Sequence, residues 1–184
     1  MSIEPDTKDW TWVIEEPCRQ CGFDPSGVVR ESLPELIHEN TRGWYAALAD
    51  GDYAVRPAPH VWSRLEYACH VRDVHELFAQ RVQLMLDQDD PTFDNWDQDA
   101  TAVEQGYDLQ DPDEVGTALV ERAAEVAAVY AAVTDDQWQR TGRRSNGSLF
   151  TVESMGTYHL HDVVHHLWDV TRSQEPSPVP PGDL

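Results

Sequence analysis

Residues 63–87, SRLEYACHVRDVHELFAQRVQLMLD, decide the fold class because they carry the clearest helical pattern in the chain. Apolar residues recur there at intervals of three and four, as on one face of an α-helix. The members of this stripe are Tyr67, Val71, Val74, Phe78, Val82 and Met85. Ser63 and Glu66 have the spacing of a capping box, which marks a helix start. The stretch predicts a long amphipathic helix with one buried face.

Three further helices are expected on either side of this one. A capping-box pattern at Ser32 and a turn signal after residue 49 bound a helix over residues 32–49. Asp111-Pro112 opens a helix that runs to residue 133, and a fourth helix covers residues 151–171. Between the second and third helices lies a long acidic connection, and no run of alternating residues indicates a strand. The pattern predicts an all-α protein, a four-helix bundle with a long crossover between its second and third helices.

The expected organisation is one domain with short additions at both ends, because 184 residues are too few for two full domains. Residues 1–24 read as an irregular N-terminal extension that contains a Cys-x-x-Cys pair. Residues 25–172 form the bundle, and residues 173–184 are a proline-rich C-terminal tail.

Charge and cysteine content exclude several classes of partner. The chain has 13 basic and 34 acidic residues, a formal net charge of −21, which disfavours binding to nucleic acid or to an anionic membrane. It contains no apolar stretch of membrane-spanning length and no signal-peptide pattern at its start. Three cysteines, an odd number, suit a reducing compartment, so we expect a cytoplasmic protein. Bundles of this size often dimerise, and a homodimer is compatible with the sequence.

Three histidines have the positions expected of metal ligands. His161 and His165 are four residues apart and share one helix face, the spacing with which a helix offers two imidazoles to one ion. His70 lies in the apolar stripe of the second helix, where a bundle interior would bring it to that pair. Three neutral imidazoles would leave open positions on a divalent ion, as in a catalytic site.

A plainer interpretation stands beside this one. Single buried histidines often only hydrogen-bond in a core. His166, next to the pair, would then join Asp162 or Asp169 in a surface arrangement without metal. Spacing alone leaves both interpretations open.

Two segments resemble the DinB-like family, also called the DinB/YfiT-like metalloenzyme superfamily. They are Trp62 to Asp73, WSRLEYACHVRD, and His161 to His166, HDVVHH. Members of that family are four-helix bundles with one histidine on the second helix and a His-x-x-x-His pair on the fourth. The resemblance covers about residues 25–172 and implies that His70, His161 and His165 bind a divalent metal such as Zn, Ni, Mn or Fe.

The resemblance also implies a small-molecule substrate and a class of chemistry. Family members with assigned activity use low-molecular-weight thiols; bacillithiol-type transferases and mycothiol-dependent maleylpyruvate isomerases are similar. We expect this chain to lack the C-terminal domain of the latter, and this disfavours that particular isomerisation. A metal ion lowers the pKa of a bound thiol or water, so the expected function is a thiol S-transferase, with a thiol such as mycothiol, or a hydrolase. The alternative is a non-catalytic metal-binding or stress-response module that binds a small ligand or a protein partner.

Four residues are candidates for the pocket around such a metal. Tyr158 and Trp168 would flank the histidine pair, and core packing is the alternative for each. Asp169, four residues after His165, is placed to orient a ligand imidazole or to face solvent. Trp96 lies in the long crossover, where it would belong to a substrate loop or anchor that loop to the bundle.

Two other motifs keep open interpretations. Arg143 and Arg144 lie in a basic loop before the fourth helix and would contact an anionic group of a substrate, or simply compensate the acidic surface. Cys18 and Cys21 resemble half of a zinc knuckle. They would form a partial zinc site with distant ligands, act as a redox pair, or carry no chemistry.

Overall fold

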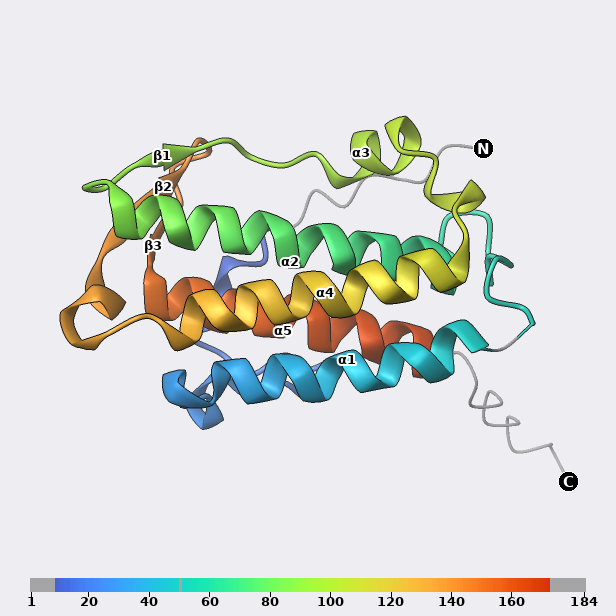
Figure 1. Ribbon diagram of the computed structural model, residues 1–184, viewed down its shortest axis with the longest axis horizontal. Helices are drawn as coiled ribbons and strands as arrows, with labels where there is room; N and C mark the ends of the chain where they lie inside the picture. Colours follow the sequence, from blue (N-terminus) through green and yellow to red (C-terminus); the bar gives the residue numbers. More distant parts are fainter. Residues whose placement is uncertain (1–8, 50, 173–184) are drawn as a thin grey trace, which may run out of the picture.

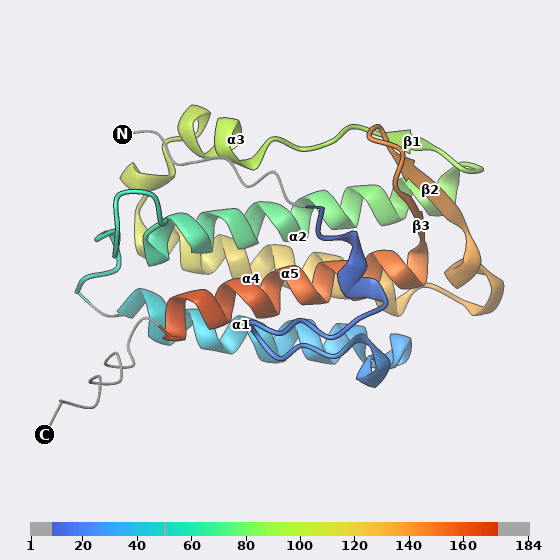
Figure 2. The ribbon, with the colours of Figure 1, turned by 180° about the vertical axis from the view of Figure 1, so that it is seen from behind.

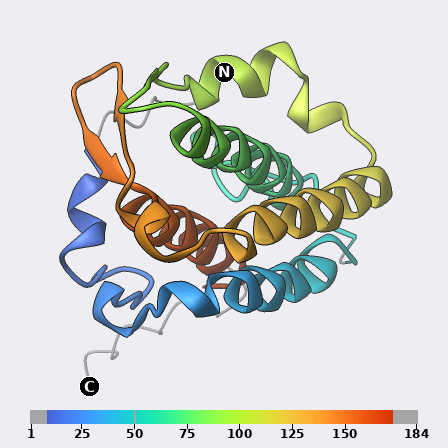
Figure 3. The same ribbon diagram turned by 60° about the vertical axis from the view of Figure 1, so that its left-hand side comes forward.

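The computed structural model describes residues 9–49 and 51–172, and the predicted four-helix bundle is confirmed. Four long helices form it: α1 (Leu33–Ala49), α2 (Arg64–Asp87), α4 (Pro112–Ala131) and α5 (Val152–Arg172). Around the bundle, α1 packs against α4 and α5, and α2 packs against the same two helices, so the order is α1, α4, α2, α5 (Figures 1 and 3). The expected tail, residues 173–184, lies outside the described residues.

The long crossover follows from the direction of the helices. Figure 1 shows α2 and α4 side by side and running the same way, so the chain must return along the bundle between them. A helix of 24 residues is about 36 Å long at 1.5 Å per residue. The returning segment contains β1 (Thr92–Phe93), α3 (Gln98–Glu104) and the 3-10 turn η4 (Tyr107–Leu109), and it covers the outer side of α2 (Figure 3).

The starts of α2 and α4 have the predicted caps, whereas Ser32, the predicted cap of the first helix, belongs to the 3-10 turn that precedes α1. At the start of α2 the Ser63 hydroxyl accepts from the Glu66 N–H at 3.2 Å, and the Glu66 carboxylate accepts from the Ser63 N–H at 2.8 Å. At the start of α4 the Asp111 carboxylate accepts from two backbone N–H groups, and Pro112 occupies the first turn. These contacts satisfy N–H groups that have no partner inside a helix.

A small sheet at one end of the bundle was not predicted. β2 (Thr141–Arg144) pairs antiparallel with β3 (Leu149–Thr151) and parallel with the short β1. The strands have only two to four residues, too few to show a period of two in the sequence. The predicted basic loop is therefore a hairpin held against the end of α2.

The N-terminal segment forms an additional layer on the bundle. It contains the 3-10 turns η1 (Thr11–Ile14), η2 (Pro25–Gly27) and η3 (Arg30–Ser32), and η1 packs against α5. Figure 2 shows this segment passing across α5 and α1. Val13, Cys18 and Phe23 are buried there, so part of the predicted extension belongs to the folded core.

The core between the helices is aromatic and tightly packed. Trp44, Tyr107, Tyr130 and Phe150 are among its largest fully buried side chains. A Cβ atom on Gly156 of α5 would lie 2.5 Å from Leu33 Cδ1, so this glycine permits the close approach of α5 and the start of α1. Across the part of the chain that the structure describes, no helix combines the length and apolar content needed to cross a bilayer.

Candidate metal centre

Helix α5 carries two adjacent pairs of polar residues with the same spacing. His161 and His165 form one pair and Asp162 and His166 the other, and each pair is four residues apart. Successive residues on a helix are rotated by about 100°, so the two pairs face different surroundings. In the folded bundle each pair contacts a different set of residues.

The pair Asp162 and His166 meets His70 of α2. One ligand atom from each of these residues lies within 4.8 Å of the others. Asp162 Oδ1 is 3.4 Å from His70 Nε2 and 3.6 Å from His166 Nε2. The contact with His70 is a long hydrogen bond and the contact with His166 is longer still, since hydrogen bonds from nitrogen to oxygen are usually about 2.7–3.2 Å long. Two ligand atoms on a tetrahedral zinc ion, at bond lengths of about 2.0–2.1 Å, lie about 3.4 Å apart, so the spacing of these three residues fits a shared ion.

Burial sets the protonation states of this group. His70 is fully buried, and loss of solvation lowers the pKa of its imidazole despite the nearby Asp162 carboxylate. Burial would raise the pKa of Asp162, but the hydrogen bond from His70 and the neighbouring histidines outweigh it and lower that pKa. The group therefore offers a neutral imidazole and an ionised carboxylate, the forms that bind a metal.

Asp169 lies behind the histidines of α5. Its Oδ2 is 3.3 Å from His166 Nδ1 and 3.7 Å from His165 Nε2. A carboxylate behind a metal-binding imidazole fixes its tautomer and ring orientation. Asp169 therefore lies next to both His165 and His166, and its orienting role stays a prediction.

Among the described residues, His70, His161 and His165 do not form one group, which differs from the grouping expected from the sequence. His161 and His165 instead meet the thiols of Cys18 and Cys21, with one ligand atom from each of the four residues within 4.8 Å of the others. The N-terminal segment covers the His161 face of α5, and this leaves the neighbouring Asp162 face opposite α2. Burial lowers the pKa of His161 to about 4, so its imidazole is neutral.

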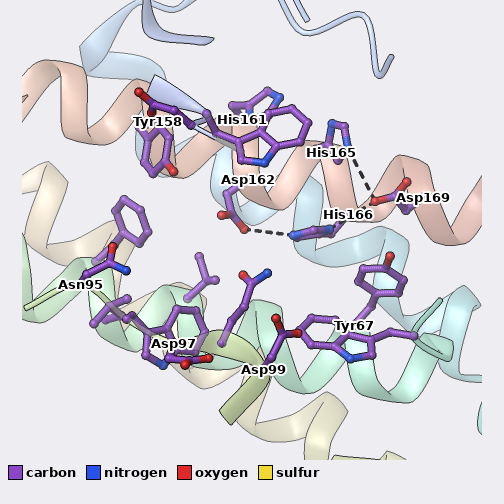
Figure 4. Close-up of a pocket in the computed structure, with 18 of the residues that line it drawn as sticks. Tyr67, Asn95, Asp97, Asp99, Tyr158, His161, Asp162, His165, His166 and Asp169 are labelled. Carbon is purple, nitrogen blue, oxygen red and sulfur yellow. Dashed lines mark hydrogen bonds and ion pairs between the residues drawn. The ribbon is translucent and has the colours of Figure 1, made fainter. Parts of the chain in front are cut away.

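A cavity of about 740 Å³ opens beside both groups. Figure 4 shows Tyr158, His161, Asp162, His165, His166 and Asp169 along α5 on one side, and Asn95, Asp97 and Asp99 of the crossover on the other. Of the predicted pocket residues, Tyr158, Asp169 and Trp96 line this cavity. Trp168 packs instead beside the His165 ring, 5.6 Å between centroids, and beneath the guanidinium of Arg172.

Trp96 combines both of the interpretations offered for it. Its ring stacks on the His70 imidazole, with centroids 5.2 Å apart and planes 11° from parallel. Its Nε1–H donates to Thr101 Oγ1 at 2.8 Å. Trp96 thus anchors the crossover to α2 and at the same time forms cavity wall over the buried histidine.

The two candidate anion contacts have different surroundings. Arg144 lines the cavity, with its guanidinium 5.9 Å from the centroid of Tyr158. Arg143 forms an ion pair with Asp90 at 2.8 Å. Arg81, which the sequence did not single out, also lines the cavity. Burial, followed by the charge of Arg144, lowers the pKa of Arg81 to about 10.

The group that Asp162 and His166 form with His70 was missed because the spacing of these two residues was interpreted as a surface pairing. The signal was present, since Asp-x-x-x-His has the same interval as His-x-x-x-His. A carboxylate and two imidazoles form a common set of ligands for zinc and for iron(II). Choosing between the two overlapping pairs required knowledge of which face of α5 meets α2.

Comparisons with known proteins agree with this fold. A sequence profile of the DinB superfamily matches residues 35–170. The solved structure of YfiT from Bacillus subtilis superposes with a TM-score of 0.70 at 18% sequence identity, over 82% of this chain and 93% of that chain. YfiT is described as a probable metal-dependent hydrolase with an unusual four-helix bundle topology. No curated protein matches the chain in sequence.

Proposed function

The chain belongs to the DinB superfamily, and from that premise we propose that it is a metal-dependent enzyme. In this proposal His70, Asp162 and His166 hold a divalent ion at the wall of the substrate cavity. The convergence of these three side chains, with Asp162 Oδ1 at 3.4 and 3.6 Å from the two imidazoles, is the observation that carries it. The description of YfiT as a probable metal-dependent hydrolase supports the same reaction class.

The ion and the protein contribute differently to the chemistry. When bound, a divalent ion supplies Lewis acidity, which lowers the pKa of a coordinated water or thiol. The Asp162 carboxylate attracts a cation more strongly than a third neutral imidazole would, because it adds a full negative charge. Asp169 holds the His166 ring in place, and stacked Trp96 shields His70 from solvent.

One part of the cavity wall, at Arg81 and Arg144, would bind an anionic group of a substrate. Arg81 and Arg144 both line it, and Arg81 Nε is buried without a hydrogen-bond partner among the described residues. The other side of that guanidinium donates to the Asp94 carbonyl at 2.8 Å, which fixes its position. A carboxylate or phosphate on the substrate would accept hydrogen bonds from further N–H groups of this guanidinium. Tyr158 and Trp96 supply the aromatic surface for the rest of the molecule.

The nucleophile is either water or a low-molecular-weight thiol, and both need the same metal centre. Hydrolysis requires one organic substrate, while S-transfer requires a thiol and an electrophile together. We expect untagged protein, loaded in turn with Zn, Ni, Mn or Fe, to turn over anionic esters or amides, or thiol–electrophile pairs. A rate that depends on thiol concentration identifies the transferase, and a rate independent of thiol identifies the hydrolase.

The ligand set is tested by substitution. His70→Ala and Asp162→Asn should each lower activity by more than about 100-fold, because changes to residues that merely support metal ligands already cost 10–100-fold. Exposed His38 of α1 provides the control, and His38→Ala should leave activity unchanged. Activity that survives Asp162→Asn would contradict this metal centre. Tight metal retention without turnover of any substrate class would favour the non-catalytic binding module.

A further inference from the structure

The second histidine pair of α5 meets the Cys-x-x-Cys motif of the N-terminal segment. Cys18, Cys21, His161 and His165 each contribute one ligand atom to a group in which all four atoms lie within 4.8 Å of one another. All three cysteines of the chain are free thiols in the structure. Two thiols and two imidazoles are the ligand set of a structural zinc site.

The spacing within the group fits a tetrahedral ion. Cys18 Sγ lies 3.7 Å from His165 Nδ1. A sulfur at about 2.3 Å and a nitrogen at about 2.0–2.1 Å from a tetrahedral zinc ion are about 3.6 Å apart. The opposite nitrogen of His165, Nε2, faces the Asp169 carboxylate at 3.7 Å. His165 is thus placed between the sulfur and a supporting carboxylate, as metal-binding histidines usually are.

The Cys-x-x-Cys segment forms a tight turn around its two sulfurs. The Gly22 N–H donates to the Cys18 carbonyl at 2.9 Å, and the Cys18 N–H donates to the Phe23 carbonyl at 2.8 Å. Gly22 has a φ of +77°, a conformation that other residues rarely adopt. Burial raises the pKa of the Cys21 thiol to about 11, and the Phe23 N–H, which is directed at Cys21, opposes that rise. The turn therefore presents both sulfurs to the histidine pair of α5.

Burial and charge also favour an ion at this position. Cys18 and His165 are buried, and buried His161 Nε2 has no hydrogen-bond partner among the described residues. A buried polar atom without a partner is costly, and a metal ion would satisfy it. Two thiolates and two neutral imidazoles bring the formal charge of a Zn²⁺ site to zero, which is the least costly state in an interior.

We propose that Cys18, Cys21, His161 and His165 bind a structural zinc ion that fastens the N-terminal segment to α5. Four protein ligands complete the coordination of the ion, so this site has no open position for substrate. The rings of Trp10 and Phe23 lie 5.7 and 5.4 Å from that of His161 and cover the group. Trp10 and Gln20 belong to the same N-terminal segment and line the cavity. By fastening this segment, the ion would fix the position of these two residues in the cavity wall.

Cobalt substitution tests this site on the wild-type protein. Reduced, untagged protein is depleted of metal and titrated with Co²⁺. We expect thiolate-to-cobalt charge-transfer absorption in the near ultraviolet and intense visible bands of tetrahedral cobalt. The group at His70 contains no sulfur and cannot produce the charge-transfer band, so this readout is independent of the proposed function. Absence of that band in the reduced protein would overturn the proposal. The same holds if Cys18 and Cys21 are isolated as a disulfide and bind no metal once that disulfide has been reduced.

Matched variants assign the signal to particular residues. The Cys18→Ser/Cys21→Ser double variant should lose the charge-transfer band and about one equivalent of zinc, and its N-terminal segment should be cleaved much faster by protease. Cys69→Ser is the cysteine control, because Cys69 lies on α2 against the Tyr107 carbonyl. Asp162→Asn alters only the other group. Both variants should keep the band, and loss of the band in Cys69→Ser would contradict the assignment.

Discussion

Arg144 and Arg143 are neighbours on β2, yet their side chains have different surroundings. Arg144 lines the cavity, whereas Arg143 pairs with Asp90. We expect Arg144→Gln to raise the KM of an anionic substrate about 10–100-fold, because hydrogen bonds to charged groups contribute about 1.5–3 kcal/mol. Arg143→Gln, the matched control, should leave KM unchanged. Steady-state kinetics on both variants make the comparison, and an equal effect of the two substitutions would rule out this contact.

A second single residue, His75, should make the free energy of unfolding depend on pH. His75 Nδ1 is 3.0 Å from His159 Nε2, and His159 Nδ1 is 3.3 Å from the Tyr130 hydroxyl. Burial, then the charge of His159, holds the pKa of His75 well below its usual value, with His38 acting the same way and Asp162 opposing it. As the pH falls below about 6.5, His75 therefore takes up a proton in the unfolded chain but not in the folded chain. This stabilisation is complete above pH 6.5 and is lost as the pH falls below it.

Replacement of His75 should remove that dependence. We expect the free energy of unfolding of His75→Leu, from urea titrations between pH 7 and 5, to fall less steeply with pH. The reduction in slope is at most about 1.4 kcal/mol per pH unit. His60→Leu, at an exposed histidine between α1 and α2, is the control. Equal slopes in His75→Leu and wild type would show that His75 does not titrate differently on unfolding.

At the scale of single elements, the cap at the start of α2 should contribute to the stability of the protein. The Ser63 hydroxyl and the Glu66 N–H form one half of a reciprocal pair at the first turn. Ser63→Ala should lower the free energy of unfolding by about 1 kcal/mol, because it leaves that N–H without its partner. Thr117→Ala removes a hydroxyl from an exposed position inside α4 and should be neutral or slightly stabilising. Urea denaturation with an unchanged m-value measures both, and an unaffected Ser63→Ala protein would refute the role of the cap.

The helices and strands also differ in how well the local sequence pattern predicts them. The starts of α2 and α4 were predicted from their caps, and the two other long helices were found within a residue or two of the expected ends. The sheet escaped prediction because its strands are held by contacts with the end of α2. A Cβ atom on Gly142, for instance, would lie 2.7 Å from Met85 Cγ. Such short strands carry no pattern of their own.

The whole molecule carries a large negative charge. Its formal net charge is −21, and repulsion among these charges destabilises the compact state. The screening length falls from about 30 Å at 0.01 M salt to about 8 Å at 0.15 M. We therefore expect the urea midpoint to rise when sodium chloride is added over that range at pH 7. A midpoint that falls or stays constant would mean that local ion pairs, such as Arg143 with Asp90, outweigh the overall repulsion.

The sequence by itself determined the four helices, their approximate ends, the crossover and the i,i+4 pairs of α5. Each of these depends on neighbouring residues, through helical periodicity or capping. Only the tertiary structure decided that Asp162 and His166 meet His70, while His161 and His165 meet Cys18 and Cys21. Periodicity gives the angle between two residues on a helix, but long-range packing sets how the whole helix is rotated. Here the packing of α5 against α1, α2 and the N-terminal segment sets that rotation.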